Sequence, residues 1–257
     1  MDYFAGIDVG SLSTDVVILD ARGEVSSYSI VDTGANSTEA SEEALEKALA
    51  EASIDRGHLL RIVATGYGRV SVPLAEKKVT EISCHALGAH HLFPDTGTVI
   101  DIGGQDSKVI RVGGDGKILD FTMNDKCAAG IGRYMETFAD LVKKDVTEIG
   151  NIPLESDEFP KLSDFCSVYA QSEALDLMRN KVPLEQVIAA YHNAMAKRIC
   201  TLVARSGVKK DFVIVGGLAK NPGIINWLEN ILEVSRLAPK PEWDLTLTVA
   251  LGAALFA

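Results

Sequence analysis

The 257-residue chain has few cysteines, no long hydrophobic run and little positive charge. Its four cysteines are too few and too dispersed for a disulfide scaffold. No stretch approaches the roughly 20 apolar residues of a membrane span, and Met1 and Asp2 lead into a strand-like segment rather than a signal peptide. We therefore expect a cytoplasmic protein.

Acidic residues outnumber basic ones by 36 to 25, which gives a formal net charge of −11. Polyanions bind to basic faces, so neither nucleic acid nor an anionic membrane is expected as a partner. The composition, 47% hydrophobic and 24% charged, is ordinary for a globular protein. The length allows one large domain or two smaller ones.

One phrase occurs twice in the chain. Residues 6–11 read Gly-Ile-Asp-Val-Gly-Ser and residues 99–106 read Val-Ile-Asp-Ile-Gly-Gly-Gln-Asp, so Asp101 follows Asp8 by 101 − 8 = 93 positions. Each phrase is an apolar run that ends in an aspartate and a glycine loop, with a β-rich run after it at residues 16–19 or 108–112. The pattern predicts two β-hairpins. Backbone N–H groups of such turns can bind phosphate, and the aspartate can hold Mg²⁺ directly or through water. The alternative is two ordinary glycine-turn hairpins.

A third motif lies at residues 213–221, where the apolar run Val-Ile-Val ends in Gly216 and Gly217. Without side chains at these two positions, a flat adenine or ribose can lie against the backbone. Asn221 is expected to be an N-cap, with Pro222 at the first helical position. A plain strand-to-helix turn is the alternative interpretation.

The remaining pattern predicts a mixed α/β chain. We expect a first domain over residues 1–95 and a second over residues 96–245, with a small apolar C-terminal helix (246–257) that packs back on the first. Helices are predicted at residues 38–53, 81–93, 131–142, 167–178, 183–206 and 223–232, and further strands at 28–31, 61–65 and 211–215.

Together, the two hairpins and the glycine pair resemble the actin-like ATPase superfamily, which also holds sugar kinases and heat-shock chaperones. The fold that this implies is α/β, with two actin-like (ribonuclease H-like) domains and a nucleotide cleft between them. Four further stretches narrow the resemblance to the reductive activase family, that is, component A of 2-hydroxyacyl-CoA dehydratases and the related ATPase subunits of benzoyl-CoA reductase. These stretches read ATGYGR at residues 64–69, EISCHA at 81–86, MNDKCAAGIGR at 123–133 and CSVYAQSE at 166–173.

The resemblance implies ATP or ADP with Mg²⁺ as ligands. It places Asp8 and Asp101 in the Mg²⁺ shell, and we expect Gln105 to position the attacking water, since an amide orients water without titrating; a simple turn residue is the alternative. The residues implied around the phosphates are Gly10, Ser11, Ser13, Thr14, Gly103 and Gly104, and those around the adenosine are Gly216, Gly217, Ala219 and Asn221.

The first loop departs from the family at Asp15, where lysine commonly follows Ser/Thr. A carboxylate close to a triphosphate would weaken nucleotide binding unless it points outward or contacts the metal.

The resemblance also implies one 4Fe–4S cluster that bridges a homodimer, with Cys127 and Cys166 as ligands from each subunit. Each of these cysteines precedes a predicted helix, whose N-terminus would stabilise a thiolate. Such clusters normally need four thiolates, so a twofold dimer would complete the set. The alternative is that both are buried cysteines.

The other two cysteines are expected to have no metal role. Cys200 lies in an apolar helical pattern and is expected in the core. Cys84 has histidines nearby, but the spacing does not fit a structural zinc site, so we expect a helix with partly exposed imidazoles at His85, His90 and His91.

The leading functional hypothesis is therefore an ATP-driven electron donor. Reduced ferredoxin or flavodoxin would load the cluster, and ATP would drive a low-potential electron to a separate iron–sulfur dehydratase or reductase acting on an acyl-CoA. The alternatives are an ATPase subunit of a benzoyl-CoA reductase-type enzyme, or a metal-free kinase or nucleotide-switch protein of the same fold. A kinase of this type needs a catalytic carboxylate and a sugar pocket, and no stretch of the sequence specifies either.

Overall fold

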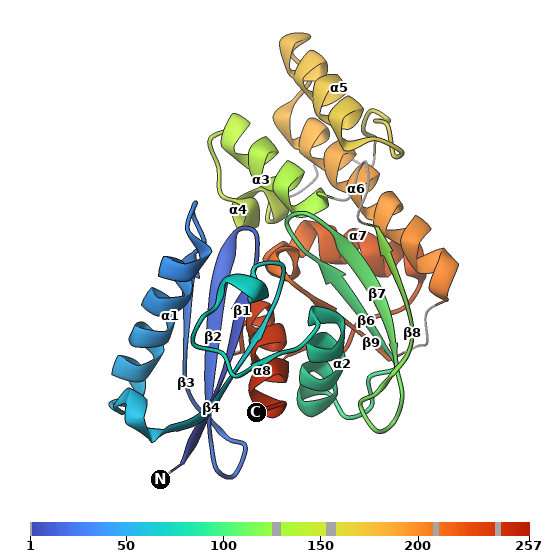
Figure 1. The fold of residues 1–257 in the computed structure, drawn as a ribbon. Helices are drawn as coiled ribbons and strands as arrows, with labels where there is room; N and C mark the ends of the chain where they lie inside the picture. The colour runs from blue at the N-terminus through green and yellow to red at the C-terminus, as the bar shows by residue number, and fades with distance from the viewer. Residues whose placement is uncertain (1, 125–129, 153–157, 208–210, 240–242) are drawn as a thin grey trace. The chain divides into compact units, whose positions relative to one another are not determined.

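The structure, a computed structural model, describes residues 2–124, 130–152, 158–207, 211–239 and 243–257. The contacts divide the chain into two compact units (Figure 1). Unit 1 comprises residues 1–96, 111–119 and 239–257, and unit 2 comprises residues 97–110 and 120–238.

Unit 1 is built on a five-stranded sheet with the order β3-β2-β1-β4-β5. The strands β1, β2 and β3 form an antiparallel meander, whereas β4 pairs parallel with both β1 and β5. Their bounds are β1 (Tyr3–Val9), β2 (Ser13–Asp20), β3 (Val25–Asp32), β4 (Leu59–Thr65) and β5 (Lys77–Lys78).

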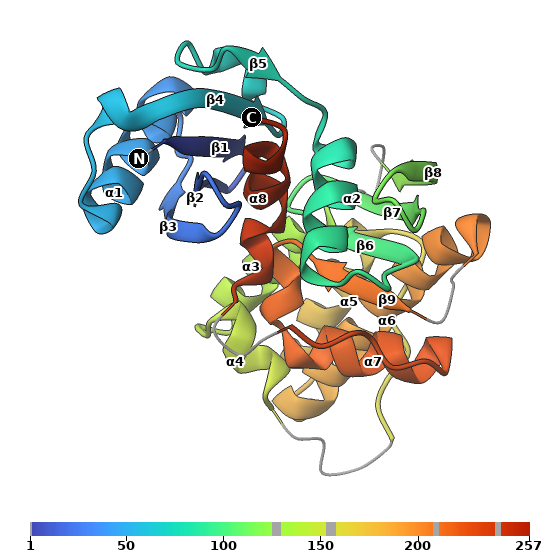
Figure 2. The same ribbon diagram turned by 90° about the horizontal axis from the view of Figure 1, so that it is seen from below.

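The two faces of this sheet are covered by different helices. Ala5, Ile7 and Val9 of β1 belong to the core cluster that includes the apolar stripe of α1 (Ser37–Ala52). Gly6 lies on the opposite face, where a side-chain carbon would stand 2.0 Å from the carbonyl oxygen of Ala250 in α8 (Thr248–Leu255). Because side chains alternate along a strand, the even-numbered positions of β1 face α8, the helix that lies beside β1 in Figure 2.

Helix α8 also packs closely on α2 (Glu81–Leu92). Both helices carry a glycine at the contact, and a side-chain carbon at Gly252 would lie 1.9 Å from the carbonyl oxygen of Cys84. The small, apolar C-terminal segment predicted from the sequence is thus a closely packed helix.

Unit 2 is built on a four-stranded sheet with the order β8-β7-β6-β9, in which β6 and β9 are parallel. The distal ends of β7 and β8, at residues 111–119, belong by their contacts to unit 1. The strands are β6 (Thr98–Ile102), β7 (Ser107–Val112), β8 (Ile118–Asn124) and β9 (Phe212–Val215), and the helices are α3 (Ile131–Leu141), α4 (Val146–Gly150), α5 (Ser167–Arg179), α6 (Leu184–Ser206) and α7 (Pro222–Leu232). The described residues also form four short 3-10 helices, at Arg56–His58, Arg69–Ser71, Gly217–Lys220 and Leu245–Leu247.

A buried polar network joins three helices of unit 2. The Asn221 side chain caps α7 by accepting from Ile224 N at 2.9 Å, and its Nδ2 donates to Val146 O at 2.6 Å. The same Oδ1 lies 3.1 Å from Nε2 of His192 in α6, whose pKa is lowered by burial. The capping role predicted for Asn221 and Pro222 is confirmed.

Most predicted elements agree with the structure to within a few residues, but two predictions are wrong. His85 is 3% exposed rather than partly exposed, because α2 packs tightly on α8. Cys200 is only partly buried rather than in the core. The sequence reading also omitted β8 and the short helix α4.

No helix in the described part of the chain is long and apolar enough to cross a membrane.

Candidate functional site

The first hairpin places Asp8 at the end of β1, opposite Asp15 of β2. Its turn is closed by a hydrogen bond from Gly10 N to Ser13 O at 2.9 Å. The alternation of the two strands puts the carboxylates of Asp8 and Asp15 on the face that α2 and α8 cover, and Asp15 is 3% exposed. Asp15 therefore does not point outward to solvent.

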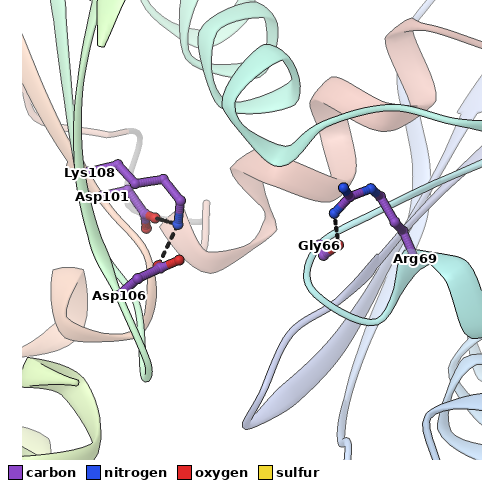
Figure 3. A network of polar contacts seen from close by, with 5 residues as sticks. All are labelled: Gly66, Arg69, Asp101, Asp106 and Lys108. Carbon is purple, nitrogen blue, oxygen red and sulfur yellow. Dashed lines mark hydrogen bonds and ion pairs between the residues drawn. The ribbon is translucent and has the colours of Figure 1, made fainter. Parts of the chain in front are cut away.

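The Asp8 carboxylate packs against Gly66, which follows the neighbouring strand. It follows β4, which runs parallel to β1, and its φ of +84° is readily adopted only by glycine. A side-chain carbon here would lie 2.2 Å from Asp8 Oδ1 and 2.6 Å from Val9 O. Arg69 fixes the same turn by donating from Nη1 to Gly66 O at 2.8 Å (Figure 3). Asp8 therefore packs directly against the Gly66 backbone, where a side chain would displace it.

Cys84 lies on the same face of the sheet, within the electrostatic reach of Asp8. Burial raises the pKa of its thiol to about 12, and a hydrogen bond with Thr65 only partly opposes this effect. The thiol is therefore neutral at physiological pH.

The second hairpin repeats the construction of the first. Its turn is closed by Gly103 N donating to Asp106 O at 3.0 Å. Asp101 is the next-to-last residue of β6 and is 3% exposed. Lys108 of β7 donates from Nζ to Asp101 Oδ2 at 3.1 Å and to Asp106 Oδ1 (Figure 3). The result is an ion-pair triad at the turn, in which Lys108 and Asp101 are buried and Asp106 is partly exposed.

Gly216 has the same relation to Asp101 that Gly66 has to Asp8. It follows β9, which runs parallel to β6, and its φ is +86°. A side-chain carbon at this position would lie 2.5 Å from Asp101 Oδ1. In each unit, therefore, a glycine with positive φ follows the strand that runs parallel to the first strand of the hairpin. This glycine lies against the carboxylate of the hairpin aspartate.

The turn of the second hairpin is also bonded to the start of α3. Gly132 N donates to Gly103 O at 3.2 Å and Arg133 N donates to Gly104 O at 3.1 Å. The contact is close, because a side-chain carbon at Gly132 would lie 2.5 Å from Gly103 O. These two N–H groups of the α3 N-terminus therefore have backbone acceptors in the hairpin turn.

The predicted phosphate residues occupy different environments. Ser11 and Gln105 are exposed at the tips of the two turns, and Ser13 is partly exposed. Thr14 lies on the opposite face of the sheet from Asp8, fully buried, with its hydroxyl 2.9 Å from that of Thr33. The turns thus present backbone groups together with the side chains of Ser11 and Gln105.

Of the predicted adenosine residues, Gly217 is exposed, and apart from its two chain neighbours no described residue has an atom within 4 Å of a side-chain carbon built there. Ala219 is 7% exposed. Asn221 is fully buried, and its side chain is engaged by Ile224, Val146 and His192.

The two cysteines predicted as cluster ligands differ in what the structure describes. Cys127 lies outside the described residues. Cys166 is partly exposed and is the N-cap residue of α5, as the sequence predicts. The positive end of the α5 dipole therefore lies at the Cys166 backbone.

The donor atoms of the hairpins suit Mg²⁺. This ion binds through one or two carboxylates and completes its shell with water and phosphate oxygens, and each hairpin offers an aspartate fixed by a glycine. Within the described residues, no group of three or more His, Cys, Asp or Glu side chains is arranged to hold a metal ion by itself. A site shared with phosphate oxygens does not need such a group.

Sequence reasoning missed three functional candidates, Gly66, Asp106 and Lys108. Gly66 lies in the stretch at residues 64–69 that carries the family resemblance. Its contact with Asp8 depends on the pairing of β4 with β1. Lys108 was counted only as part of a β-rich run. When the two hairpins are aligned at their offset of 93 residues, Lys108 corresponds to Asp15 and Asp101 to Asp8. This alignment places Lys108 opposite Asp101.

Two α/β units, each with a glycine-turn hairpin and a fixed aspartate, define the class of actin-like ATPase folds. A ROK family glucokinase from Streptomyces griseus shares the fold, with a TM-score of 0.56 at 15% identity. More specifically, the chain belongs to the BadF/BadG/BcrA/BcrD ATPase family, whose sequence profile matches residues 5–257.

The relatives cover nearly the whole chain. A 2-hydroxyisocaproyl-CoA dehydratase activator from Clostridioides difficile is 38% identical over 99% of this chain and 94% of its own. The crystal structure of (R)-2-hydroxyglutaryl-CoA dehydratase component A from Acidaminococcus fermentans matches with a TM-score of 0.92 at 37% identity, covering 100% of this chain and 98% of the other. The structure of the Clostridium difficile activator of 2-hydroxyisocaproyl-CoA dehydratase with bound ADPNP gives the same TM-score of 0.92 at 37% identity, over 99% and 94%. A benzoyl-CoA reductase subunit from Thauera aromatica is more distant, at 26% identity over 100% of this chain and 93% of its own.

Proposed function

We propose that this protein is an ATP-dependent electron-transfer activator of a 2-hydroxyacyl-CoA dehydratase-type partner. Its near full-length similarity to relatives named as activators of such dehydratases carries the proposal. Membership of an ATPase family supports ATP and ADP as its nucleotides. The electron would come from a reduced ferredoxin or flavodoxin, and ATP binding and hydrolysis would drive its delivery.

Cys166 and Cys127 are the proposed ligands of a 4Fe–4S cluster, with two further thiolates from a second copy of the chain. The position of Cys166 supports this role, because a partly exposed thiol at a helix N-terminus is favoured as thiolate. When bound, the cluster would take up one electron from the donor and release it to the dehydratase.

The surface around Cys166 supports a homodimer. Phe165, Val168 and Tyr169 are 74%, 56% and 60% exposed, and the two aromatic rings lie 6.0 Å apart. Large apolar side chains clustered on a surface favour burial against a partner. A second copy at this surface would bring together the two thiolates of each chain.

The contact between the second hairpin and α3 supports coupling of the nucleotide to the cluster. Gly103 and Gly104 are proposed phosphate residues, and their carbonyls accept hydrogen bonds from the first turn of α3. Cys127 precedes that turn by a few residues in the sequence. A shift of the hairpin turn on ATP binding would therefore be passed to α3, the helix that follows Cys127 in the sequence.

Asp8 and Asp101 are the proposed Mg²⁺ residues, and the two hairpin turns would bind the phosphates through backbone N–H groups. Gln105, exposed at the tip of its turn, is proposed to orient the attacking water. Gly216 and Gly217 are proposed to face the adenosine.

An ATPase subunit of a benzoyl-CoA reductase-type enzyme is the second candidate, favoured by the relative from Thauera aromatica. Its lower identity makes it the weaker of the two. The likeness to a glucokinase is one of fold alone and does not support a kinase.

Anaerobic purification tests the proposal. We expect a brown dimer with about four irons and four sulfides per dimer. Cys127→Ser and Cys166→Ser should each give colourless protein that still binds ATP, whereas the matched changes Cys84→Ser and Cys200→Ser should keep the colour. A colourless parent protein, or bleaching by Cys200→Ser but not by Cys166→Ser, would contradict the ligand assignment.

A further inference from the structure

Lys108 is a buried charge at the second hairpin that the proposed function leaves without a role. Its side chain is 2% exposed, while those of its partners Asp101 and Asp106 are 5% and 27% exposed. A lysine is almost never so buried unless it is paired, because the ammonium loses its hydration. The two carboxylates therefore hold the ammonium in place (Figure 3).

The first hairpin has the opposite charge at the equivalent position. Lys108 follows Asp15 by 108 − 15 = 93 residues, the same offset that relates Asp101 to Asp8. The closing hydrogen bonds of the two turns correspond as well, Gly10 N to Ser13 O and Gly103 N to Asp106 O. Only the second hairpin therefore combines its aspartate with a basic residue at this position.

We propose that Lys108 is the resident counter-ion of Asp101 and Asp106, and that it keeps free divalent cations off these carboxylates until a nucleotide arrives. The inference rests on the proposed function, in which Asp101 belongs to the Mg²⁺ shell. A bare Mg²⁺ at Asp101 would lie close to the ammonium in a poorly screened interior, where like charges repel strongly. The triphosphate of ATP brings enough negative charge to hold both cations, so the metal enters together with the nucleotide.

Binding of Mn²⁺ to the nucleotide-free protein tests this inference, with free Mn²⁺ measured by electron paramagnetic resonance. Lys108→Gln removes the charge and should create one Mn²⁺ site, with affinity raised by about tenfold or more as the repulsion is lost. Lys108→Arg keeps the charge and should bind Mn²⁺ as the parent does. Adding Asp101→Asn to Lys108→Gln should abolish the new site.

Lys117→Gln is the matched control. Lys117 lies on the same β7–β8 hairpin and pairs with Asp115 at 2.8 Å, but its side chain is 80% exposed. Its loss removes the same charge from the chain without uncovering a buried carboxylate, so Mn²⁺ binding should not change.

Two results would overturn the inference. One is a folded Lys108→Gln variant that binds no more Mn²⁺ than the parent. The second result does not depend on a lysine variant that folds. It is the binding of a Mn²⁺ ion by the nucleotide-free parent protein, if Asp101→Asn then removes that ion. Failure of the Mg²⁺ assignment within the proposed function would look different, because Asp101→Asn would then leave the Mn²⁺ affinity of the ATP-bound parent unchanged.

Discussion

Comparing Gly66→Ala with a control glycine should separate two contributions to the free energy of unfolding. One is the contact of position 66 with Asp8, and the other is the general cost of replacing a glycine that has positive φ. Gly23, in the turn between β2 and β3, provides the matched control, because its φ of +82° is almost the same as the +84° of Gly66. Apart from its two chain neighbours, no described residue has an atom within 4 Å of a side-chain carbon at position 23. At position 66 the same carbon would lie 2.2 Å from Asp8 Oδ1.

Both substitutions force an alanine into the left-handed region, which costs about 1 kcal/mol. Both also restrict the unfolded chain in the same way, so this effect cancels between them. Only Gly66→Ala must push the Asp8 carboxylate and the Val9 carbonyl aside, and overpacking of this kind costs roughly 1–3 kcal/mol more. The free energy of unfolding should therefore fall by about that amount more for Gly66→Ala than for Gly23→Ala.

The assay is urea unfolding followed by circular dichroism, together with calorimetric titration with Mg·ADP. Displacement of Asp8 should weaken nucleotide binding by about tenfold, equivalent to about 1.4 kcal/mol, in Gly66→Ala only. Equal destabilisation by the two variants, with unchanged nucleotide affinity in both, would refute the argument that Gly66 positions Asp8.

Three further predictions concern single positions. Asp8→Ala and Asp101→Ala should each abolish Mg²⁺-dependent ATP hydrolysis while the circular dichroism spectrum is kept; hydrolysis at the parental rate would remove that residue from the Mg²⁺ shell. Gly217→Trp should lower nucleotide affinity with little loss of stability, because position 217 has open space within the described structure, and unchanged affinity in a calorimetric titration would exclude Gly217 from the adenosine site. Cys84 should resist alkylation at about pH 8 until the protein unfolds. Because its pKa is raised from 9.0 to about 12 in the fold, the free energy of unfolding should decrease as the pH rises from about 9 towards 12, and Cys84→Ala should remove this decrease.

Local patterns were sufficient to predict many of the elements. The strand–glycine turn–strand phrases gave both hairpins, and Asn221 followed by Pro222 gave the start of α7. The small residues of the C-terminal segment predicted a helix that packs closely, and the contact of Gly252 with Cys84 O is of that kind. Each of these signals lies within a few residues of the structure that it predicts.

Other features depended on tertiary contacts. The burial of His85 follows from the packing of α2 on α8, which its own periodicity does not reveal. The contacts of Gly66 with Asp8 and of Gly216 with Asp101 join strands that are distant in sequence. Helix α4, by contrast, had a local signal that was overlooked: Asp145 and Glu148 form a capping box at its start.

Delivery of an electron to a dehydratase tests the central claim most directly. The anaerobically purified dimer, reduced with dithionite and freed of excess reductant, would be mixed with an oxidised 2-hydroxyacyl-CoA dehydratase and either Mg·ATP or Mg·ADPNP. We predict that the dehydratase gains activity with Mg·ATP, while the activator loses its reduced signal in electron paramagnetic resonance, and that it gains none with Mg·ADPNP. A reduced, cluster-loaded dimer that hydrolyses ATP yet activates neither this dehydratase nor others of its type would contradict the account.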